Sequence, residues 1–231
     1  MKVEDLNVTI LAYTRPKTFK RVFESCMQNI NKVNVIIDKP ANTKISLKQE
    51  QILDIIKNSK ADCRVIRRST NYGLVKSVLT AVDEGLQSHD HIVLLEDDCL
   101  PNLNFFEFMA KSLEEHKNNL SISTVCGTKT SCRFNPWGWA TWKHKWDYKN
   151  FSLQDILNSP SLDIQLKNFL QNNAVEESIW SLNWLAYQYI NGCSSVFPKH
   201  NLIKNIGLDD GGVHDHKKGY TQWLLSQIIQ D

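Results

Sequence analysis

The sequence has 231 residues, 42% of them hydrophobic, which is enough to bury the core of one large domain or two small ones. The net charge of +2 comes from basic and acidic residues interleaved along the chain, so charge gives no indication of a nucleic-acid partner. Six scattered cysteines form no CxxC pair, which argues against a zinc ribbon or a small disulfide scaffold. No apolar run approaches the roughly 20 residues that span a bilayer. We therefore expect a cytoplasmic protein, with peripheral association at the inner face of the plasma membrane left open.

The first hundred residues alternate short β-branched runs with amphipathic ones. Apolar residues at helical spacing predict helices over residues 18–30, 46–59 and 71–88. Strands are expected between them, at residues 7–13, 33–38, 63–68 and 91–96. This alternation predicts βαβ crossovers and a mostly parallel α/β sheet of the nucleotide-binding type.

After Pro101 the pattern is less regular. We expect a helix and a strand, then a tryptophan-rich stretch, a polar helical stretch, a further helix, a short strand and a closing helix, over residues 102–119, 121–127, 135–146, 153–170, 177–192, 193–198 and 220–230. No repeat or linker divides the chain. We therefore expect one domain over residues 1–231, with a nucleotide-sugar-binding half (1–100) and an acceptor-side half with a C-terminal lid (101–231).

Three consecutive acids, Glu96, Asp97 and Asp98, follow the fourth predicted strand. Ligands of open parallel sheets bind at the carboxyl ends of the strands, so the triplet lies where a ligand is expected. Side chains of an extended segment alternate, which predicts Glu96 and Asp98 on one side and Asp97 on the other. Carboxylates suit Mg²⁺ or Mn²⁺ together with a diphosphate. The alternative is that the acids are hydrated or cap the next helix.

Four separated motifs follow one another along the chain: "NYGLVKSVLTAVDEGL", "IVLLEDDCLPNLNFFEFM", "WGWATW" and "NLIKNIGLDDGGVH". Together they resemble bacterial glycosyltransferases of the GT-A fold that act on capsular and lipopolysaccharide glycans. The "LEDD…P…FFEF" portion is also similar to the animal Golgi N-acetylglucosaminyltransferase that initiates complex N-glycans. The resemblance implies a Rossmann-like GT-A sheet flanked by helices, an irregular C-terminal acceptor lobe, and an enzyme that uses a nucleotide-sugar donor.

The resemblance also implies roles for the acids. Asp98 would contact a divalent ion, Mn²⁺ or Mg²⁺, that bridges the donor's diphosphate. Glu96 and Asp97 would face the ribose and the donor sugar. His214, in the glycine-rich segment, would touch the metal or the diphosphate.

Further donor contacts are implied at the ends of the other strands. Tyr13 and Arg15 match the place where the base and phosphates begin to be held, and Asp38 would lie near the base. Asn71 and Gly73 would form a turn close to the nucleotide, because glycine permits such a turn. The alternatives are a surface position for Arg15, a cap for Asp38 and a simple helix start for the Asn71–Gly73 turn.

Four tryptophans fall within ten residues: Trp137, Trp139, Trp142 and Trp146. The spacing of the last three predicts a shared helical face. The resemblance places this stretch beside the donor and acceptor pocket. We predict that Trp142 and Trp146 pack in the core and that Trp137 and Trp139 form a pocket wall.

An inverting transferase needs a base that takes the proton from the acceptor hydroxyl. The resemblance places an acid near "VEESIWSLNW", yet Ser181 follows Trp180 where an Asp is commonly met. Glu177 is our preferred base, followed by Glu176, with Asp210 as a further alternative. The two glutamates could equally stabilise a helix N-terminus through its dipole.

The residues and the resemblance together lead us to expect a metal-dependent glycosyltransferase that moves a sugar from a UDP-sugar to a hydroxyl of a bacterial surface glycan or lipid-linked glycan. A sugar-nucleotide pyrophosphorylase would need a glycine-rich loop after the first strand, and residues 13–16 lack one. The non-enzymatic alternative is a nucleotide- or glycan-binding protein of the same fold. Donor sugar, acceptor, linkage and stereochemistry are left open.

Overall fold

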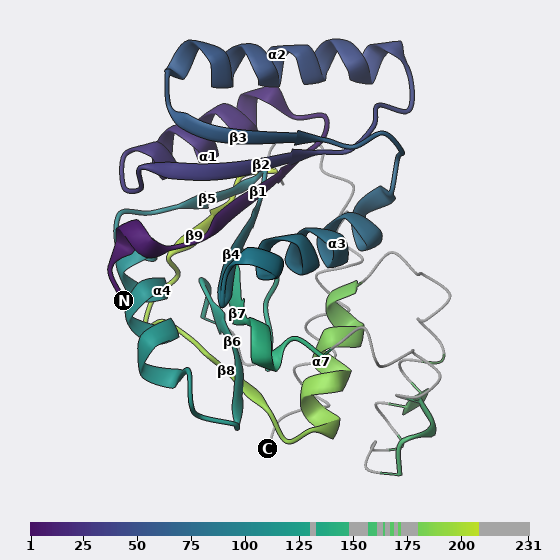
Figure 1. The fold of residues 1–231 in the computed structure, drawn as a ribbon. Coiled ribbons are helices and arrows are strands. Elements are labelled where there is room, and N and C mark those ends of the chain that lie inside the picture. The colour runs from purple at the N-terminus through teal and green to yellow at the C-terminus, as the bar shows by residue number, and fades with distance from the viewer. Residues whose placement is uncertain are drawn as a thin grey trace.

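The computed structural model describes residues 1–129, 133–147, 157–160, 164, 167, 168, 171 and 180–207. A seven-stranded sheet forms its centre, in the order β3-β2-β1-β4-β7-β6-β8 (Figure 1). The first four strands are parallel and are β1 Val8–Ala12, β2 Lys32–Ile37, β3 Asp62–Arg67 and β4 His91–Glu96. The predicted α/β class with a mostly parallel sheet is confirmed.

Helices cover both faces of this sheet. The first four are α1 Pro16–Met27, α2 Thr43–Ser59, α3 Gly73–Ser88 and α4 Phe105–His116. Apolar side chains of α1, α2 and α4 share one core with alternate strand residues such as Ile10. Those of α3 and of α7 Trp180–Ile190 share a second core with the intervening residues, such as Leu11. Burial of both strand faces explains why β1 and β4 are apolar at consecutive positions.

The second half of the chain completes the sheet. Strand β7 (Trp139–Trp142) lies antiparallel between β4 and β6 (Ile122–Cys126), and β8 (Ser194–Val196) pairs parallel with β6. A separate ribbon pairs β5 (Cys99–Pro101) with β9 (Ile203–Asn205). Two short 3₁₀ turns, η1 Val3–Asp5 and η2 Lys143–Lys145, accompany these elements.

The predicted helical face of the tryptophans is wrong. Trp139 and Trp142 belong to strand β7, and residues three apart on a strand point to opposite faces. Trp139 accordingly lies in the core under α3 and α7, whereas Trp142 lies in the core under α4 and donates its Nε1–H to the carbonyl of Leu113 at 3.0 Å. Trp142 and Trp146 are both buried, as expected of packing residues.

Two other expectations fall on residues that the structure describes only in part or not at all. The polar stretch over 153–170 is described at a few positions, and the closing helix over 220–230 lies outside the described residues. In the part of the chain that is described, no helix has the length and apolar character needed to cross a bilayer.

Candidate functional site

The site lies at the carboxyl edge of the parallel strands. In the order β3-β2-β1-β4, the chain runs outward from β1 to β3 and then returns to β4 on the other side of β1. The gap between the ends of β1 and β4 is therefore the switch point at which open α/β sheets bind ligands. The loop after β1 and the acidic triplet after β4 meet at this gap.

The two aspartates of the triplet reach the same cation. Glu96 is the last residue of β4, whereas Asp97 and Asp98 form the turn before β5. Nη1 of Arg15 lies 3.4 Å from Asp97 Oδ1 and donates a short hydrogen bond to Asp98 Oδ2. The backbone N–H of Tyr13 donates to Asp97 Oδ2 at 3.1 Å. The simple alternation expected for an extended segment does not hold, because the turn swings both aspartates toward Arg15.

Burial and like charge disfavour ionisation of Glu96 and Asp97. Burial raises the pKa of Glu96 to about 8, with the neighbouring aspartates adding to the effect. Burial also raises the pKa of Asp97 to about 7, although Arg15 acts in the opposite direction. Burial works to lower the pKa of Arg15, but the nearby carboxylates outweigh it and the pKa is raised above its ordinary value. The triplet therefore favours a cation, and Arg15 supplies one.

The backbone of Arg15 is fixed by the start of α1. Pro16 occupies the first helical position, for which its fixed φ is suited. The carbonyl of Arg15 accepts hydrogen bonds from the N–H of Phe19 at 2.9 Å and from Thr18 Oγ1 at 3.2 Å. The side chain is 27% exposed, so the guanidinium touches both the carboxylates and solvent.

Asp38, directly after β2, caps helix α3. Its carboxylate accepts hydrogen bonds from the N–H groups of Tyr72 and Gly73, at 2.7 and 2.9 Å, and from Ser77 Oγ at 3.2 Å. These donors satisfy the first turn of the helix, and the side chain is only 8% exposed. The cap that the sequence left as an alternative is thus present, and contact with the base stays a prediction.

Asn71 links three of the loops at this edge. Its Nδ2 donates to Tyr13 Oη and to the carbonyl of Lys39, both at 2.8 Å. Its Oδ1 accepts from the N–H of Gly73 at 3.1 Å, and Gly73 has the positive φ of 70° that glycine adopts without strain. The predicted donor contacts Tyr13, Asn71 and Gly73 are therefore brought together, with Asn71 and Gly73 exposed to solvent.

Gly207 lies against the carboxylate of Asp98 and was missed by sequence reasoning. The N–H of Ile206 donates to the carbonyl of Asp98 at 2.9 Å, and a Cβ on Gly207 would overlap Asp98 Oδ2. The signal in the sequence was only a glycine-containing segment. Which carboxylate it approaches depends on the pairing of β5 with β9, which spans about a hundred residues of sequence.

The two tryptophans predicted to form a pocket wall, Trp137 and Trp139, differ in their exposure to solvent. Leu94 pairs with Trp139, so Trp137 lies two residues farther toward the Glu96 end of β4. Trp137 is half-buried and lines a groove of about 460 Å³ along the β5–β9 ribbon, with Leu100, Pro101, Asn102 and residues 201–205. Trp139 is 1% exposed and packs against Phe134 and Trp180. The structure corrects the prediction for Trp139, which is a core residue.

Four predicted residues lie outside the described part of the chain. These are the candidate bases Glu177, Glu176 and Asp210 and the candidate metal contact His214. The described neighbours of the first two, Trp180 and Ser181, are buried at the start of α7.

Few protein side chains at this site could coordinate a divalent ion. Among the described residues, no group of three or more His, Cys, Asp or Glu side chains is placed to hold a metal by itself. Mg²⁺ and Mn²⁺ need only one or two protein carboxylates when phosphates and water complete the shell. Asp98 fits such an ion once a diphosphate is present, provided that Arg15 leaves its Oδ2.

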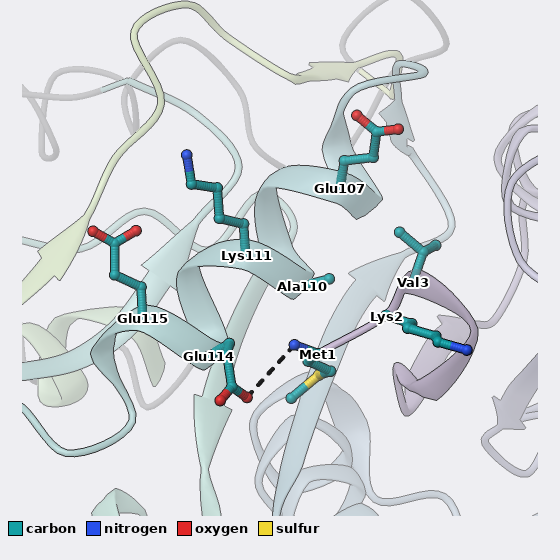
Figure 2. Close-up of a pocket in the computed structure, with 8 residues that line it drawn as sticks. All are labelled: Met1, Lys2, Val3, Glu107, Ala110, Lys111, Glu114 and Glu115. Atoms are coloured by element: carbon teal, nitrogen blue, oxygen red, sulfur yellow. Dashed lines mark ion pairs between the residues drawn. The ribbon is translucent and has the colours of Figure 1, made fainter.

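A second hollow lies away from this edge, between the N-terminal turn and α4. It measures about 550 Å³, and Figure 2 shows the residues that line it, among them Met1, Lys2 and Glu107. The amino group of Met1 lies 3.6 Å from Glu114 Oε2, the ion pair drawn dashed in Figure 2. It contains none of the residues predicted to bind a donor.

Comparison with known proteins gives one family. The model of the family described as Glycosyl transferase family 2 matches residues 7–180, which include the four parallel strands and the acidic triplet. A search of curated protein sequences found no match.

A search of solved structures gave matches that include three proteins with low sequence identity to this chain. TarS from S. aureus is 12% identical with a TM-score of 0.44, and the match covers 84% of this chain but 59% of that one, less than two thirds of its length. Glucosyl-3-phosphoglycerate synthase from M. tuberculosis is 10% identical, with 99% and 83% of the chains covered and a TM-score of 0.45. The 4-diphosphocytidyl-2C-methyl-D-erythritol synthase from Anaerococcus prevotii is 9% identical, with 99% and 100% covered and a TM-score of 0.47.

Proposed function

We propose, since the chain belongs to glycosyl transferase family 2, that it transfers a sugar from a nucleotide diphosphate donor, a UDP-sugar, to a hydroxyl of a bacterial surface glycan or lipid-linked glycan. The observation that carries the proposal is the convergence of Tyr13, Arg15, Asn71 and the acidic triplet at the switch point. These groups combine an aromatic ring, a guanidinium, an amide and carboxylates. Such groups can bind the base, the diphosphate, the ribose and the sugar of a nucleotide-sugar donor.

Each group has a role in the proposed reaction. The Tyr13 and Asn71 side chains, hydrogen-bonded to each other, would hold the base, and Arg15 would bind the diphosphate, because a guanidinium pairs well with phosphate. Glu96 and Asp97 would accept hydrogen bonds from hydroxyls of the ribose and the donor sugar. A Mn²⁺ or Mg²⁺ ion held by Asp98 would neutralise charge on the departing diphosphate.

The acceptor would enter beside Trp137. The groove along the β5–β9 ribbon is lined by Asn205, the partner of Cys99, and by the partly exposed indole of Trp137, on which the apolar face of a sugar can stack. Glu177, with Glu176 and Asp210 as alternatives, would take the proton from the acceptor hydroxyl in an inverting transfer. In this proposal the protein works at the inner face of the plasma membrane, where it would meet a lipid-linked acceptor.

The rival pyrophosphorylase reaction lacks support at the phosphate loop. The connection between β1 and α1 contains Tyr13, Thr14 and Arg15 but no glycine, whereas a backbone cradle for phosphates is usually glycine-rich. A pyrophosphorylase would release pyrophosphate and a transferase would release the nucleoside diphosphate. One assay can therefore separate the two reactions.

The test is a donor panel with product analysis. The chain is incubated with UDP-, GDP- and dTDP-sugars, with Mn²⁺ or with EDTA, and released nucleoside diphosphate and pyrophosphate are measured. We expect UDP release from one UDP-sugar in Mn²⁺, loss of release in EDTA, and a fall of at least about a hundredfold in Asp98→Asn. Glu115→Gln, an exposed change on α4, is the matched control and should behave as wild type.

Two outcomes contradict the proposal. If UDP binding is unaffected both by Mn²⁺ and by Asp98→Asn, the metal-dependent site is wrong. If UDP binds normally but no donor is ever hydrolysed or transferred, the chain is a binding protein of this fold.

A further inference from the structure

We propose that Arg15 is an internal counter-cation that occupies Asp98 while the donor is absent and exchanges to the diphosphate when the donor arrives, so that divalent metal binding depends on the nucleotide. This inference rests on the proposed function, because it assigns Asp98 to the metal. It concerns how the site is kept closed to a metal before the donor arrives.

The carboxylate of Asp98 is enclosed in the donor-free chain. Arg15 Nη1 donates to its Oδ2, and Gly207 approaches the same oxygen so closely that a Cβ there would overlap it. Its other oxygen, Oδ1, faces the thiol of Cys99 at 3.6 Å. The side chain is only 9% exposed. A metal ion can therefore reach Oδ2 only if the guanidinium moves.

A guanidinium and a divalent ion compete for this oxygen. Two cations held on one carboxylate oxygen repel each other strongly in a partly buried site, where screening by water is weak. Asp97 does not offer a metal an easier place, because its Oδ1 lies 3.4 Å from the same guanidinium and its Oδ2 accepts the N–H of Tyr13. A metal ion alone must consequently displace Arg15 without giving the guanidinium a new partner.

A diphosphate provides that partner. Guanidinium groups form strong charge-assisted hydrogen bonds with phosphate oxygens. Arg15 stands immediately before the N-terminus of α1, and the positive end of the helix dipole favours an anion nearby. The Arg15 side chain is 27% exposed, so it can turn without unfolding its surroundings. Asp97 keeps the hydrogen bond from Tyr13 N–H after Arg15 leaves, so the exchange does not leave this buried carboxylate alone.

The exchange couples the two ligands. The diphosphate withdraws Arg15 from Asp98, and the freed carboxylate then binds the metal. By linkage the metal must strengthen nucleotide binding by the same factor as the nucleotide strengthens metal binding. Metal alone is expected to bind weakly for this reason.

The test measures Mn²⁺ binding without any nucleotide, by electron paramagnetic resonance of free Mn²⁺, in wild type, Arg15→Gln, Arg15→Lys and the double variant Arg15→Gln with Asp98→Asn. We expect Arg15→Gln to bind Mn²⁺ about tenfold more tightly than wild type, an effect of the size usual for coupled ligands. Arg15→Lys keeps a positive charge and should stay near wild type. The double variant should lose the gain, since the gain is assigned to Asp98.

A second titration measures UDP in saturating Mn²⁺ by calorimetry. Here Arg15→Gln should bind UDP about tenfold more weakly, because the phosphate loses its guanidinium. The opposite signs of the two effects cannot come from a residue that only supports the fold. Circular dichroism of each variant verifies that it is folded, and Arg15→Lys serves as the folded comparison if Arg15→Gln is unstable.

Two results of these titrations would contradict the proposed exchange of Arg15. They are an unchanged or weaker Mn²⁺ affinity of Arg15→Gln without nucleotide, or a gain that persists when Asp98 is also replaced. The proposed function fails separately, by the absence of Mn²⁺-dependent UDP binding and of donor turnover in wild type. An unchanged Mn²⁺ affinity alongside normal turnover would therefore reject the exchange and keep the transferase.

Discussion

Asp38 illustrates how a single side chain at this edge serves the fold. It follows β2, and its carboxylate accepts from two backbone N–H groups and one hydroxyl of α3. The loop that carries Asn71 is held in place by the same helix start. The start of α3 and the position of the Asn71 loop thus depend on one buried carboxylate.

Replacing Asp38 with Ala should destabilise the protein. The change removes the acceptor of Tyr72 N–H and of Ser77 Oγ and one of the two acceptors of Gly73 N–H, and a partly buried donor left without an acceptor is costly. We expect the free energy of unfolding, measured with urea, to fall by roughly 2–4 kcal/mol. Asp54→Ala, an exposed acid on α2, is the control and should change it by less than about 0.5 kcal/mol. Equal effects of the two changes would show that the cap contributes nothing.

Gly207→Ala tests the enclosure of Asp98. A methyl group at residue 207 would overlap Asp98 Oδ2, so either the ribbon or the carboxylate must shift. We expect Mn²⁺-dependent UDP binding, measured by calorimetry, to weaken about tenfold, which corresponds to about 1.4 kcal/mol. Lys199→Ala, an exposed change in the same part of the chain, should leave binding unaltered. Unchanged binding in Gly207→Ala would mean that the position of Asp98 is not set by this contact.

The roles of single residues could be predicted from the sequence to different degrees. The triplet was located because three acids after an apolar run are visible in a short window. The capping role of Asp38 could be stated only as an alternative, since its partners lie more than thirty residues away. Gly207 could not be assigned at all, because its partner is fixed by long-range pairing of the β5–β9 ribbon.

At the scale of elements, the regular alternation of the first hundred residues was readable, and so were α4, β6, α7 and β8 after it, whereas strands β5, β7 and β9 were not. Strands β1 to β4 and helices α1 to α3 follow the predicted ranges closely. Strand β7 was mistaken for a helix, because a short central strand buried on both faces has tryptophans on each side and no alternation. Strands β5 and β9 have three residues each, too few to show any period.

The amino edge of the sheet is held by a buried polar network. Asn7 Nδ2 donates to the carbonyls of Gly85 and His91, and its Oδ1 accepts from Asn34 Nδ2 at 3.0 Å. The N–H of Asn7 donates to His91 Nε2 at 3.2 Å. Only a neutral imidazole can accept this hydrogen bond, so the network joining β1, β2, α3 and β4 requires uncharged His91.

Acid should therefore weaken this network. Burial lowers the pKa of His91, so as pH falls below about 6.5 the unfolded chain takes up a proton that the folded chain does not. Stability contributed by neutral His91 is present above that pH and is lost as pH falls toward 5. His91→Gln keeps an acceptor but does not titrate, so its urea-derived free energy of unfolding should fall less than that of wild type between pH 7 and 5. His144→Gln, exposed in η2, is the control; parallel curves for wild type and His91→Gln would contradict the assignment.

At the scale of the whole molecule, the strand order determines which loops meet at the carboxyl edge of the sheet. Alternating strands and helices predict right-handed crossovers, and these bring the loops after β1 to β4 to a common edge. That part of the architecture follows from periodicity. The insertion of β7 between β4 and β6 and the closure by the β5–β9 ribbon do not, because both depend on antiparallel pairings between distant segments.

Donor binding should protect one edge of the sheet and leave the other unchanged. Hydrogen exchange followed by mass spectrometry, with and without UDP and Mn²⁺, should show slower exchange in peptides that contain Tyr13 to Arg15, Asn71 to Gly73 and Glu96 to Cys99. These loops meet at the switch point, and a bound diphosphate orders backbone N–H groups there. Peptides at the amino edge, around Asn31, Lys60 and Asp90, should exchange at the same rate in both states.

The hollow between the N-terminal turn and α4 makes this measurement decisive. It is larger than the groove beside Trp137, and its lining residues come from the N-terminal segment and α4, none of them from the loops that follow the parallel strands. Size alone would favour it as a ligand site, whereas convergent polar groups favour the strand edge. If UDP slowed exchange around Met1 to Val3 and along α4 but not at the strand edge, the donor site would be misplaced. We expect the reverse, because the N-terminal hollow has no counterpart to the paired Tyr13 and Asn71 side chains or to the Arg15 guanidinium held between two carboxylates.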